Sequence, residues 1–308
     1  MEVLFYTMDT TYHIGEATVQ KLFGEETLAE RNGKVVTNKI IPGAINFIEK
    51  QHFIVASSRN LAGEIWVSAL AGATGFINVK GESILEINTD LLYSNPYDVL
   101  WINIEEVHKI GLLFIELSSR RRFRINGTLC MDSKKLVITV SQAYPNCPKY
   151  IQQRHVQPTE KPYYSREASN GERLTAPLVD LIKMADTFFV GSSSPGADMD
   201  ASHRGGLPGF VTVKDDSTLM IPDYPGNSMF NTLGNFYINP AAGITFIDFE
   251  SNTNLQLSGS AQIFMTKDEP LPGQTNRYWV FKINKWVRSA NLKGFEWNFV
   301  SYSPFNPK

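Results

Sequence analysis

The sequence has few cysteines, almost no net charge and no long hydrophobic run. Its two cysteines, Cys130 and Cys147, form neither a CxxC pair nor a disulfide framework, so a reducing, cytoplasmic location is expected. The 29 basic and 31 acidic residues leave a net charge of −2, which gives no indication of a nucleic-acid partner. No segment is apolar enough to span a bilayer, and the residues after Met1 do not resemble a signal peptide, so no membrane association is expected.

Several motifs of catalysis and cofactor binding are also missing. The five histidines are scattered along the chain, so none has the spacing of a metal-ligand pair and no metal is expected. The sequence has no P-loop, no nucleophile elbow and no GxGxxG, and the last absence argues against a dinucleotide bound on a Rossmann fold. No residue stands out as a catalytic acid or base.

The chain does contain an ordered internal repeat. Segments 53–58, 75–79 and 111–117 match segments 188–193, 209–213 and 243–249, at offsets of 135, 134 and 132 positions. Chance similarity between β-rich segments would give one such match but hardly an ordered series. A length of 308 residues suits two ordinary domains. We therefore interpret the chain as a tandem duplication, in which Gly75 corresponds to Gly209 and Gly111 to Gly243.

Hydrophobic periodicity predicts a strand-rich fold with a few short helices. Helices are expected over 17–22, 42–51, 98–107, 177–185 and 228–238, and strands over 53–57, 64–69, 75–80, 83–87, 111–117, 136–140, 256–265 and 278–283. The aromatic tail around residues 295–299 is expected to lie on the second unit.

Polar residues and glycines gather at the predicted strand ends between Ala201 and Pro240. The runs are Ser202-His203-Arg204-Gly205-Gly206, Pro208-Gly209-Phe210-Val211, Ile221-Pro222-Asp223-Tyr224-Pro225-Gly226-Asn227 and Asn231-Thr232-Leu233-Gly234-Asn235. Such loops can offer backbone N–H groups, an arginine fork and hydroxyls to a phosphate. By composition alone, the turn residues of two hairpins and a helix start are the simpler interpretation.

Taken together, these runs resemble the FMN-binding proteins related to pyridoxamine 5′-phosphate oxidase, whose fold is a split β-barrel. The resemblance implies a mainly β fold with α-helices, built from two tandem FMN-binding split barrels. Their expected bounds are 41–157 for the first barrel and 177–308 for the second with its C-terminal tail. Residues 1–40 would form an N-terminal extension, and 158–176 a packed linker that carries Tyr163 and Tyr164.

The same resemblance implies a flavoprotein that binds FMN and acts as an oxidoreductase on an unidentified small-molecule substrate. The alternative is a non-catalytic carrier of flavin or heme, because related barrels bind other cofactors or none. Barrels of this family associate through large faces, so a homodimer of chains is compatible with the resemblance.

In this family FMN lies in a groove between two barrels, with its phosphate held by basic and hydroxyl side chains. We expect Arg204 to bind the phosphate. The supporting residues are expected to be Ser202, His203, Asn227, Ser228, Asn231 and Asn235, with Tyr224 or Trp286 near the flavin ring. The first half has Ser68-Ala69-Leu70 in place of Ser202-His203-Arg204, so one FMN site per chain is expected.

Three other features have structural interpretations. The cluster Arg120-Arg121-Arg122-Phe123-Arg124 is interpreted as a turn followed by a solvated strand face, because Asn252-Thr253-Asn254-Leu255-Gln256 takes the same place in the second half. Cys147 stands between two prolines with no partner motif, which indicates a structural role. His13 is expected to cap a helix or lie on the surface.

Overall fold

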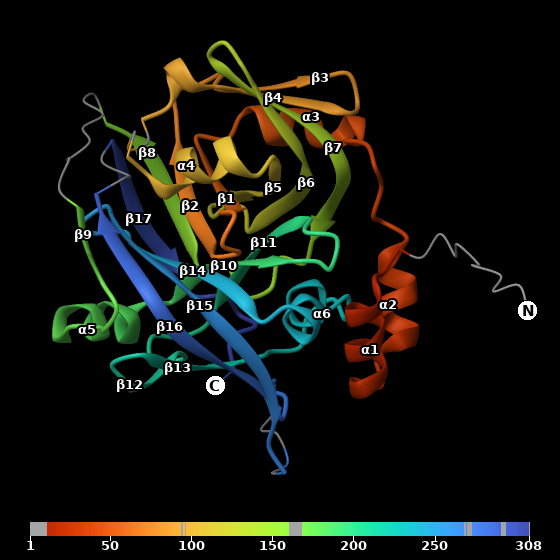
Figure 1. Ribbon diagram of the computed structural model, residues 1–308, viewed down its shortest axis with the longest axis vertical. Helices are drawn as coiled ribbons and strands as arrows, with labels where there is room; N and C mark the ends of the chain where they lie inside the picture. Colours follow the sequence, from red (N-terminus) through yellow and green to blue (C-terminus); the bar gives the residue numbers. More distant parts are fainter. Residues whose placement is uncertain are drawn as a thin grey trace, which may run out of the picture.

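The chain forms two large antiparallel sheets with short helices around them (Figure 1). The computed structural model describes residues 11–93, 95, 97–159, 168–267, 269, 273–290 and 294–307. The predicted fold class, mainly β with helices and two units, is confirmed. Among the described residues, no helix is long and apolar enough to cross a membrane.

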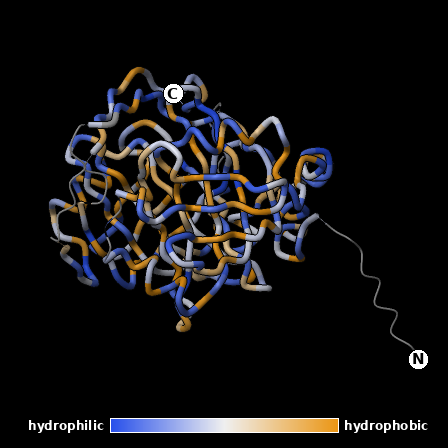
Figure 2. The backbone as a smooth tube through the Cα atoms, turned by 90° about the horizontal axis from the view of Figure 1, so that it is seen from above, coloured by the Kyte–Doolittle hydropathy of each residue, from blue (hydrophilic) through white to orange (hydrophobic). Residues whose placement is uncertain are grey.

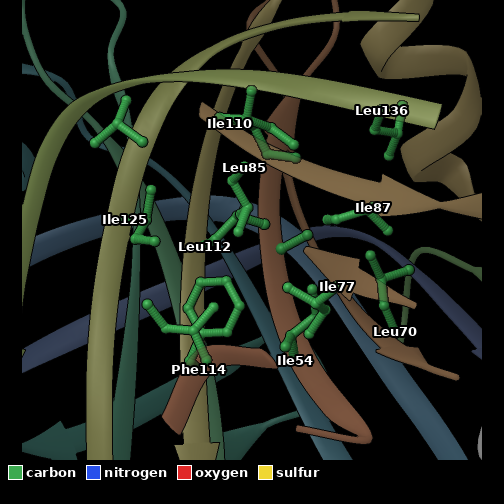
Figure 3. Packing of buried hydrophobic residues seen from close by; sticks show 14 of the residues in the cluster. Ile54, Leu70, Ile77, Leu85, Ile87, Ile110, Leu112, Phe114, Ile125 and Leu136 are labelled. Atoms are coloured by element: carbon green, nitrogen blue, oxygen red, sulfur yellow. The ribbon is translucent and has the colours of Figure 1, made fainter. Parts of the chain in front are cut away.

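The first unit has one helix before its sheet and another within the strand sequence. Its elements are α3 (Pro42–Glu49), β1 (Phe53–Arg59), β2 (Ile65–Ala71), β3 (Ile77–Lys80), β4 (Ile84–Asn88), the short 3₁₀ helix η1 (Thr89–Leu91), α4 (Val99–Glu106), β5 (Lys109–Glu116), β6 (Arg121–Asp132) and β7 (Lys135–Asn146). The strands lie in the order β2-β1-β5-β6-β7-β4-β3. Side chains such as Ile54, Leu112 and Phe114 point toward one another inside this sheet and form its core (Figure 3).

The second unit repeats this order. Its elements are α5 (Ala176–Met184), β10 (Thr187–Ser193), β11 (Met199–Gly205), β12 (Thr212–Asp215), β13 (Thr218–Pro222), α6 (Asn231–Ile238), β14 (Ala241–Asp248), β15 (Thr253–Met265) and β16 (Arg277–Ser289). The strands lie in the order β11-β10-β14-β15-β16-β13-β12. The strand predicted over 278–283 is thus longer, and it includes Trp286. Phe188, Phe246 and Trp279 are buried in the core of this unit.

The glycines expected to be equivalent occupy equivalent places. Gly111 is the third residue of β5 and Gly243 the third of β14, while Gly75 and Gly209 precede β3 and β12 with φ angles of 83° and 87°. A Cβ at Gly111 would lie 2.8 Å from the backbone of Asp200, and one at Gly243 would lie 2.6 Å from the carbonyl oxygen of Ile65. Glycine at these two positions therefore lets the units approach each other closely.

A third core lies between the units and is closed by two further strands. β8 (Gln153–Pro158) follows the first sheet and pairs with β17 (Phe295–Ser301), which follows the second. Phe295 and Trp297 of β17 pack against this core, so the aromatic tail lies between the two units rather than on the second alone. Hydrophobic residues are frequent along the strands that cross the middle of the molecule (Figure 2).

The stretch between β8 and α5 is only in part a linker. β9 (Ala168–Gly171) pairs with β16 and so extends the second sheet, whereas residues 160–167, with Tyr163 and Tyr164, lie outside the described part of the chain.

The N-terminal segment packs against the second unit. It contains α1 (Ile14–Phe23), longer than the predicted 17–22, and α2 (Glu26–Gly33), and α1 lies beside α6 in Figure 1. His13 caps α1. Its imidazole accepts a hydrogen bond from the Gly15 N–H at 3.0 Å, and the backbone N–H of His13 donates to the Glu16 carboxylate at 2.9 Å. The prediction of a capping histidine is confirmed. A Cβ at Gly15 would lie 2.2 Å from the Gly234 carbonyl oxygen, so glycine permits the close contact of α1 with α6.

Candidate functional site

A pocket with a basic lining lies between the two units, next to β11 and the loop that precedes α6. Its lining surrounds about 880 Å³ of atom-free space, counting the part open to solvent. Five cationic side chains line it, namely Arg122, Arg124, Lys149, Arg204 and Arg277. The first three come from the first half of the chain and the other two from the second half, so the site is built within one chain.

Arg204 and Arg277 share a buried carboxylate. Arg204 Nη1 lies 2.9 Å from Asp223 Oδ1, and Arg277 Nε lies 3.0 Å from Asp223 Oδ2. Arg277 also pairs with Glu25 of the N-terminal segment at 2.6 Å. Arg204, on β11, is therefore held in place from one side and lines the pocket.

Arg124 connects the two units across the pocket floor. Its guanidinium lies 2.9 Å from Asp200 Oδ1, donates to the Ala201 carbonyl at 2.9 Å, and donates to Ser202 Oγ and, at 2.7 Å, to Tyr144 Oη. Only 5% of the Arg124 side chain is exposed. Its charge is therefore largely compensated by the Asp200 carboxylate.

Arg122 differs from its neighbours because it has no carboxylate partner among the described residues. Its guanidinium donates to the carbonyl oxygens of Cys147 at 2.6 Å and His203 at 3.2 Å. Burial, together with the nearby Arg124 and Arg204, lowers the pKa of Arg122 to about 9, which leaves it charged at neutral pH. The interpretation of Arg122 and Arg124 as a solvated face is wrong, although period two does place them on one side of β6.

The charges around the pocket do not balance. The carboxylates of Asp200, Asp223 and Glu25 form ion pairs with Arg124, Arg204 and Arg277, and Glu16 adds a fourth negative charge near Arg124, so one positive charge is left in excess. Lys149, like Arg122, forms no ion pair within the described part of the chain. Such an excess in a partly buried pocket favours an anionic ligand.

His203 adds a neutral group that has no partner of its own. It is buried, and neither ring nitrogen forms a hydrogen bond with the described residues. Burial and the neighbouring Arg122 and Arg204 hold the pKa of His203 well below 6.5, so the ring is neutral. Its edge packs against the Phe189 ring at a centroid distance of 5.7 Å. A buried neutral imidazole can exchange a hydrogen bond with a ligand in this pocket.

Ser202 and Asn231 line the pocket but already have partners. Ser202 Oγ accepts hydrogen bonds from Arg124 and, at 3.0 Å, from Thr232 Oγ1. Asn231 donates to Glu16 Oε1 at 2.5 Å, and its own oxygen accepts from Arg124 at 3.3 Å. Both side chains therefore form part of the pocket wall and also hold Arg124 in position.

Asn227 and Ser228 form the turn at the pocket rim. The Asn227 carbonyl accepts a hydrogen bond from Asn32 at 2.7 Å, and Ser228 Oγ donates to Glu25 at 2.5 Å. The turn is thus fixed by the N-terminal helices, which sequence patterns did not indicate.

Aromatic rings form the apolar part of the lining. Tyr224 lies with its ring centroid 5.2 Å from that of Tyr150, and Phe210 and Phe230 also line the pocket. These rings offer an apolar contact surface for a planar ligand beside the cations. Burial raises the pKa of Tyr150 to about 12, so its hydroxyl keeps its proton at neutral pH and donates to the Pro225 carbonyl at 2.9 Å.

Two of the expected site residues lie elsewhere. Trp286 is buried in the core of the second unit, and its indole N–H donates to the Arg173 carbonyl at 2.8 Å, so its placement near a flavin ring is corrected. Asn235 lies on a neighbouring pocket, where its oxygen contacts His13 Nε2 at 2.8 Å and its amide donates to Ser192 at 2.8 Å.

The equivalent place on the first unit lacks the cations. Gln256 stands where β6 has Arg124, and it donates to the Val67 carbonyl at 3.0 Å and to Ser68 Oγ at 3.1 Å. Asn254 stands where β6 has Arg122, and both of its side-chain polar atoms are buried without partners among the described residues. The two halves thus share a backbone arrangement, while only one of the two places carries arginines.

Comparisons with known proteins give similarity in structure alone. No family model matches the sequence, and no curated protein sequence matches it. The chain is similar to HupZ of Group A Streptococcus, with 15% identity, 39% of this chain and 94% of that chain covered, and a TM-score of 0.31.

Two other solved structures show likenesses of the same order. A Clostridium acetobutylicum protein related to general stress protein 26 of the pyridoxinephosphate oxidase family is 12% identical. The match covers 39% of this chain and 89% of that chain, with a TM-score of 0.28. HutZ, a heme storage protein of Vibrio cholerae, is 11% identical. The match covers 42% of this chain and 95% of that chain, with a TM-score of 0.25. TM-scores below 0.5 do not bear on what this chain binds.

Proposed function

We propose that this chain is an FMN-binding flavoprotein of the class related to pyridoxamine 5′-phosphate oxidase, and that it acts as an oxidoreductase on a small molecule in the cytoplasm. The observation that supports this most is the excess of positive charge around one pocket, with Arg122 lacking any carboxylate partner in the described chain. A phosphate dianion would supply the missing negative charge.

The lining fits the two ends of FMN. Arg122 and Lys149 form no ion pair in the described chain, and Arg204 shares Asp223 with Arg277, so we propose these three cations as the ligands of the phosphate. The rings of Tyr150 and Tyr224 offer the apolar contact that a flavin needs. Bound FMN would supply hydride or electron transfer at its ring, while the chain binds the phosphate and limits the access of water.

The stoichiometry of binding tests this proposal. Titration of the purified protein with FMN, followed by quenching of flavin fluorescence, is expected to reach one tightly bound FMN per chain. The physical reason is that Gln256 and Asn254 replace the arginines on the other side, where a buried dianion would be uncompensated. Two tight sites per chain, or none, would contradict the proposal.

Replacement of Arg204 with alanine is expected to weaken FMN binding about ten- to a hundredfold, because one charge-assisted hydrogen bond to phosphate is lost. Asp223 keeps its pair with Arg277, so the fold is expected to persist. The matched control is Arg173→Ala, which removes an exposed arginine paired with Asp216 far from the pocket. Unchanged affinity in a folded Arg204→Ala protein would count against a phosphate at this residue.

A heme-binding carrier is the second candidate, and His203 is the observation that favours it. Its neutral imidazole, buried with both ring nitrogens unpartnered in the described structure, has the protonation state of an iron ligand. The absorption spectrum of the protein after addition of each cofactor distinguishes the two. A Soret band that is lost in His203→Ala would favour heme, whereas flavin absorption retained on gel filtration would favour FMN.

A further inference from the structure

A second pocket adjoins the basic one, and Asn231 lines both. It holds about 780 Å³ of atom-free space, including its open part, and lies among α1, β6, β7, β11 and α6. Its titratable lining consists of Tyr12, His13, Glu16, Tyr144, Asp198 and Asp200. The two adjoining pockets therefore have linings of opposite charge.

Asp200 has one carboxylate oxygen without a donor. Oδ1 lies 2.9 Å from Arg124, but Oδ2 is buried and forms no hydrogen bond with the described residues. Only 6% of the Asp200 side chain is exposed. A buried acceptor without a partner is unfavourable, so a donor supplied by a ligand would be stabilising here.

Glu16 is a second buried carboxylate in the same pocket. It accepts hydrogen bonds from Asn231 at 2.5 Å and from the backbone N–H of His13 at 2.9 Å, and the nearest side-chain cation among the described residues is the His13 imidazole at 3.6 Å, which is charged only when protonated. Burial raises the pKa of Glu16, which reflects the cost of its charge in this place. A cation bound beside it would reduce that cost.

The other acid of the pocket is already neutralised. Asp198 pairs with Lys109 at 2.7 Å, and about half of its side chain is exposed. The charge of Asp200 is compensated by Arg124, so the pocket offers a ligand the carboxylate of Glu16 and the free acceptor oxygen of Asp200.

We propose that this acid-lined pocket binds a protonated organic amine, whose N–H groups donate to Asp200 Oδ2 and to Glu16. An ammonium group has three donors and one positive charge, so it can donate to the free oxygen of Asp200 and offset the buried charge of Glu16. Tyr12 and Tyr144 supply the apolar wall for the carbon skeleton next to the charge. The inference does not require FMN in the basic pocket, although an amine bound here would lie next to a ligand bound there.

The probe for this test is benzylamine, with benzyl alcohol as the uncharged molecule of similar shape. Saturable binding of benzylamine is expected by NMR titration of the full chain at neutral pH, while benzyl alcohol is expected to bind at least about tenfold more weakly. Glu16→Gln is expected to weaken benzylamine binding at least about tenfold, and it preserves the helix cap because glutamine also accepts the His13 N–H. Asp200→Asn tests the second acceptor.

The control is Asp216→Asn, the same chemical change at an exposed site outside both pockets. Equal binding of benzylamine and benzyl alcohol, or unchanged benzylamine binding in both pocket variants, would overturn the inference. FMN titration of the same samples separates the two proposals. Benzylamine binding without FMN binding would refute the proposed function alone, and FMN binding without benzylamine binding would refute this inference alone.

Discussion

Replacing Arg122 with alanine is expected to weaken FMN binding by about ten- to a hundredfold, and by at least as much as the loss of Arg204. The Arg204 charge is partly neutralised by Asp223 at 2.9 Å, whereas the hydrogen bonds of Arg122 to described residues go to carbonyl oxygens. Arg122 is therefore expected to contribute more than Arg204 to the binding free energy of an anion in the pocket. The measurement is the dissociation constant for FMN, determined by fluorescence quenching at two salt concentrations.

Two further variants make the result specific to charge. Arg122→Lys keeps the positive charge and is expected to lose less affinity than Arg122→Ala. Arg120→Ala is the matched control, because Arg120 also donates to carbonyl oxygens, those of Ile151 and Tyr302, but does not line the pocket. Equal losses in Arg120→Ala and Arg122→Ala would show that the effect comes from packing of the strand rather than from the pocket.

Replacing Gly259 with alanine is expected to lower the free energy of unfolding by about 3 kcal/mol or more. A Cβ at Gly259 would lie 1.9 Å from the Lys282 carbonyl oxygen, at a break in the register between β15 and β16. Gly127 takes the same place in the first sheet, where a Cβ would lie 2.3 Å from the Thr139 carbonyl oxygen. Because both obstacles are backbone atoms, the strands would have to separate.

Urea unfolding followed by circular dichroism measures this effect. The control is Gly43→Ala in α3, where an added Cβ meets no atom within 4 Å and alanine favours the helix by up to about 1 kcal/mol. A Gly259→Ala protein as stable as the wild type would show that the strands of the second sheet can shift at the bulge without cost.

Local patterns predicted the features that depend on neighbouring residues. The repeat was predicted from matching segments and most strands from hydrophobic periodicity, and the structure agrees with both and with a cap at His13. The expected helix over 228–238 begins later, at Asn231, because the preceding turn is fixed by contacts with α2 and Glu25.

The sequence predicted less of the site, because its main partners come from the other half of the chain. Arg122 and Arg124 were interpreted as solvated, since the acceptors on β11 lie about 80 positions away and no local pattern indicates that β11 packs there. Trp286 was expected near the flavin ring because it is aromatic. Its strand, however, continues past the predicted end and places it in the core. Conversely, Ser202, His203, Arg204, Tyr224, Asn227, Ser228 and Asn231 do line one pocket.

The pairing of β8 with β17 sets an order for the assembly of the molecule. β8 ends at Pro158, but its partner begins only at Phe295, so this ribbon cannot form until the chain has been synthesised past β17. Arg122 and Arg124 are synthesised well before the acceptors on β11 that they contact. During that interval the two arginines of the nascent first half stay exposed to water. The basic pocket forms only after β11 has been synthesised and has packed against β6.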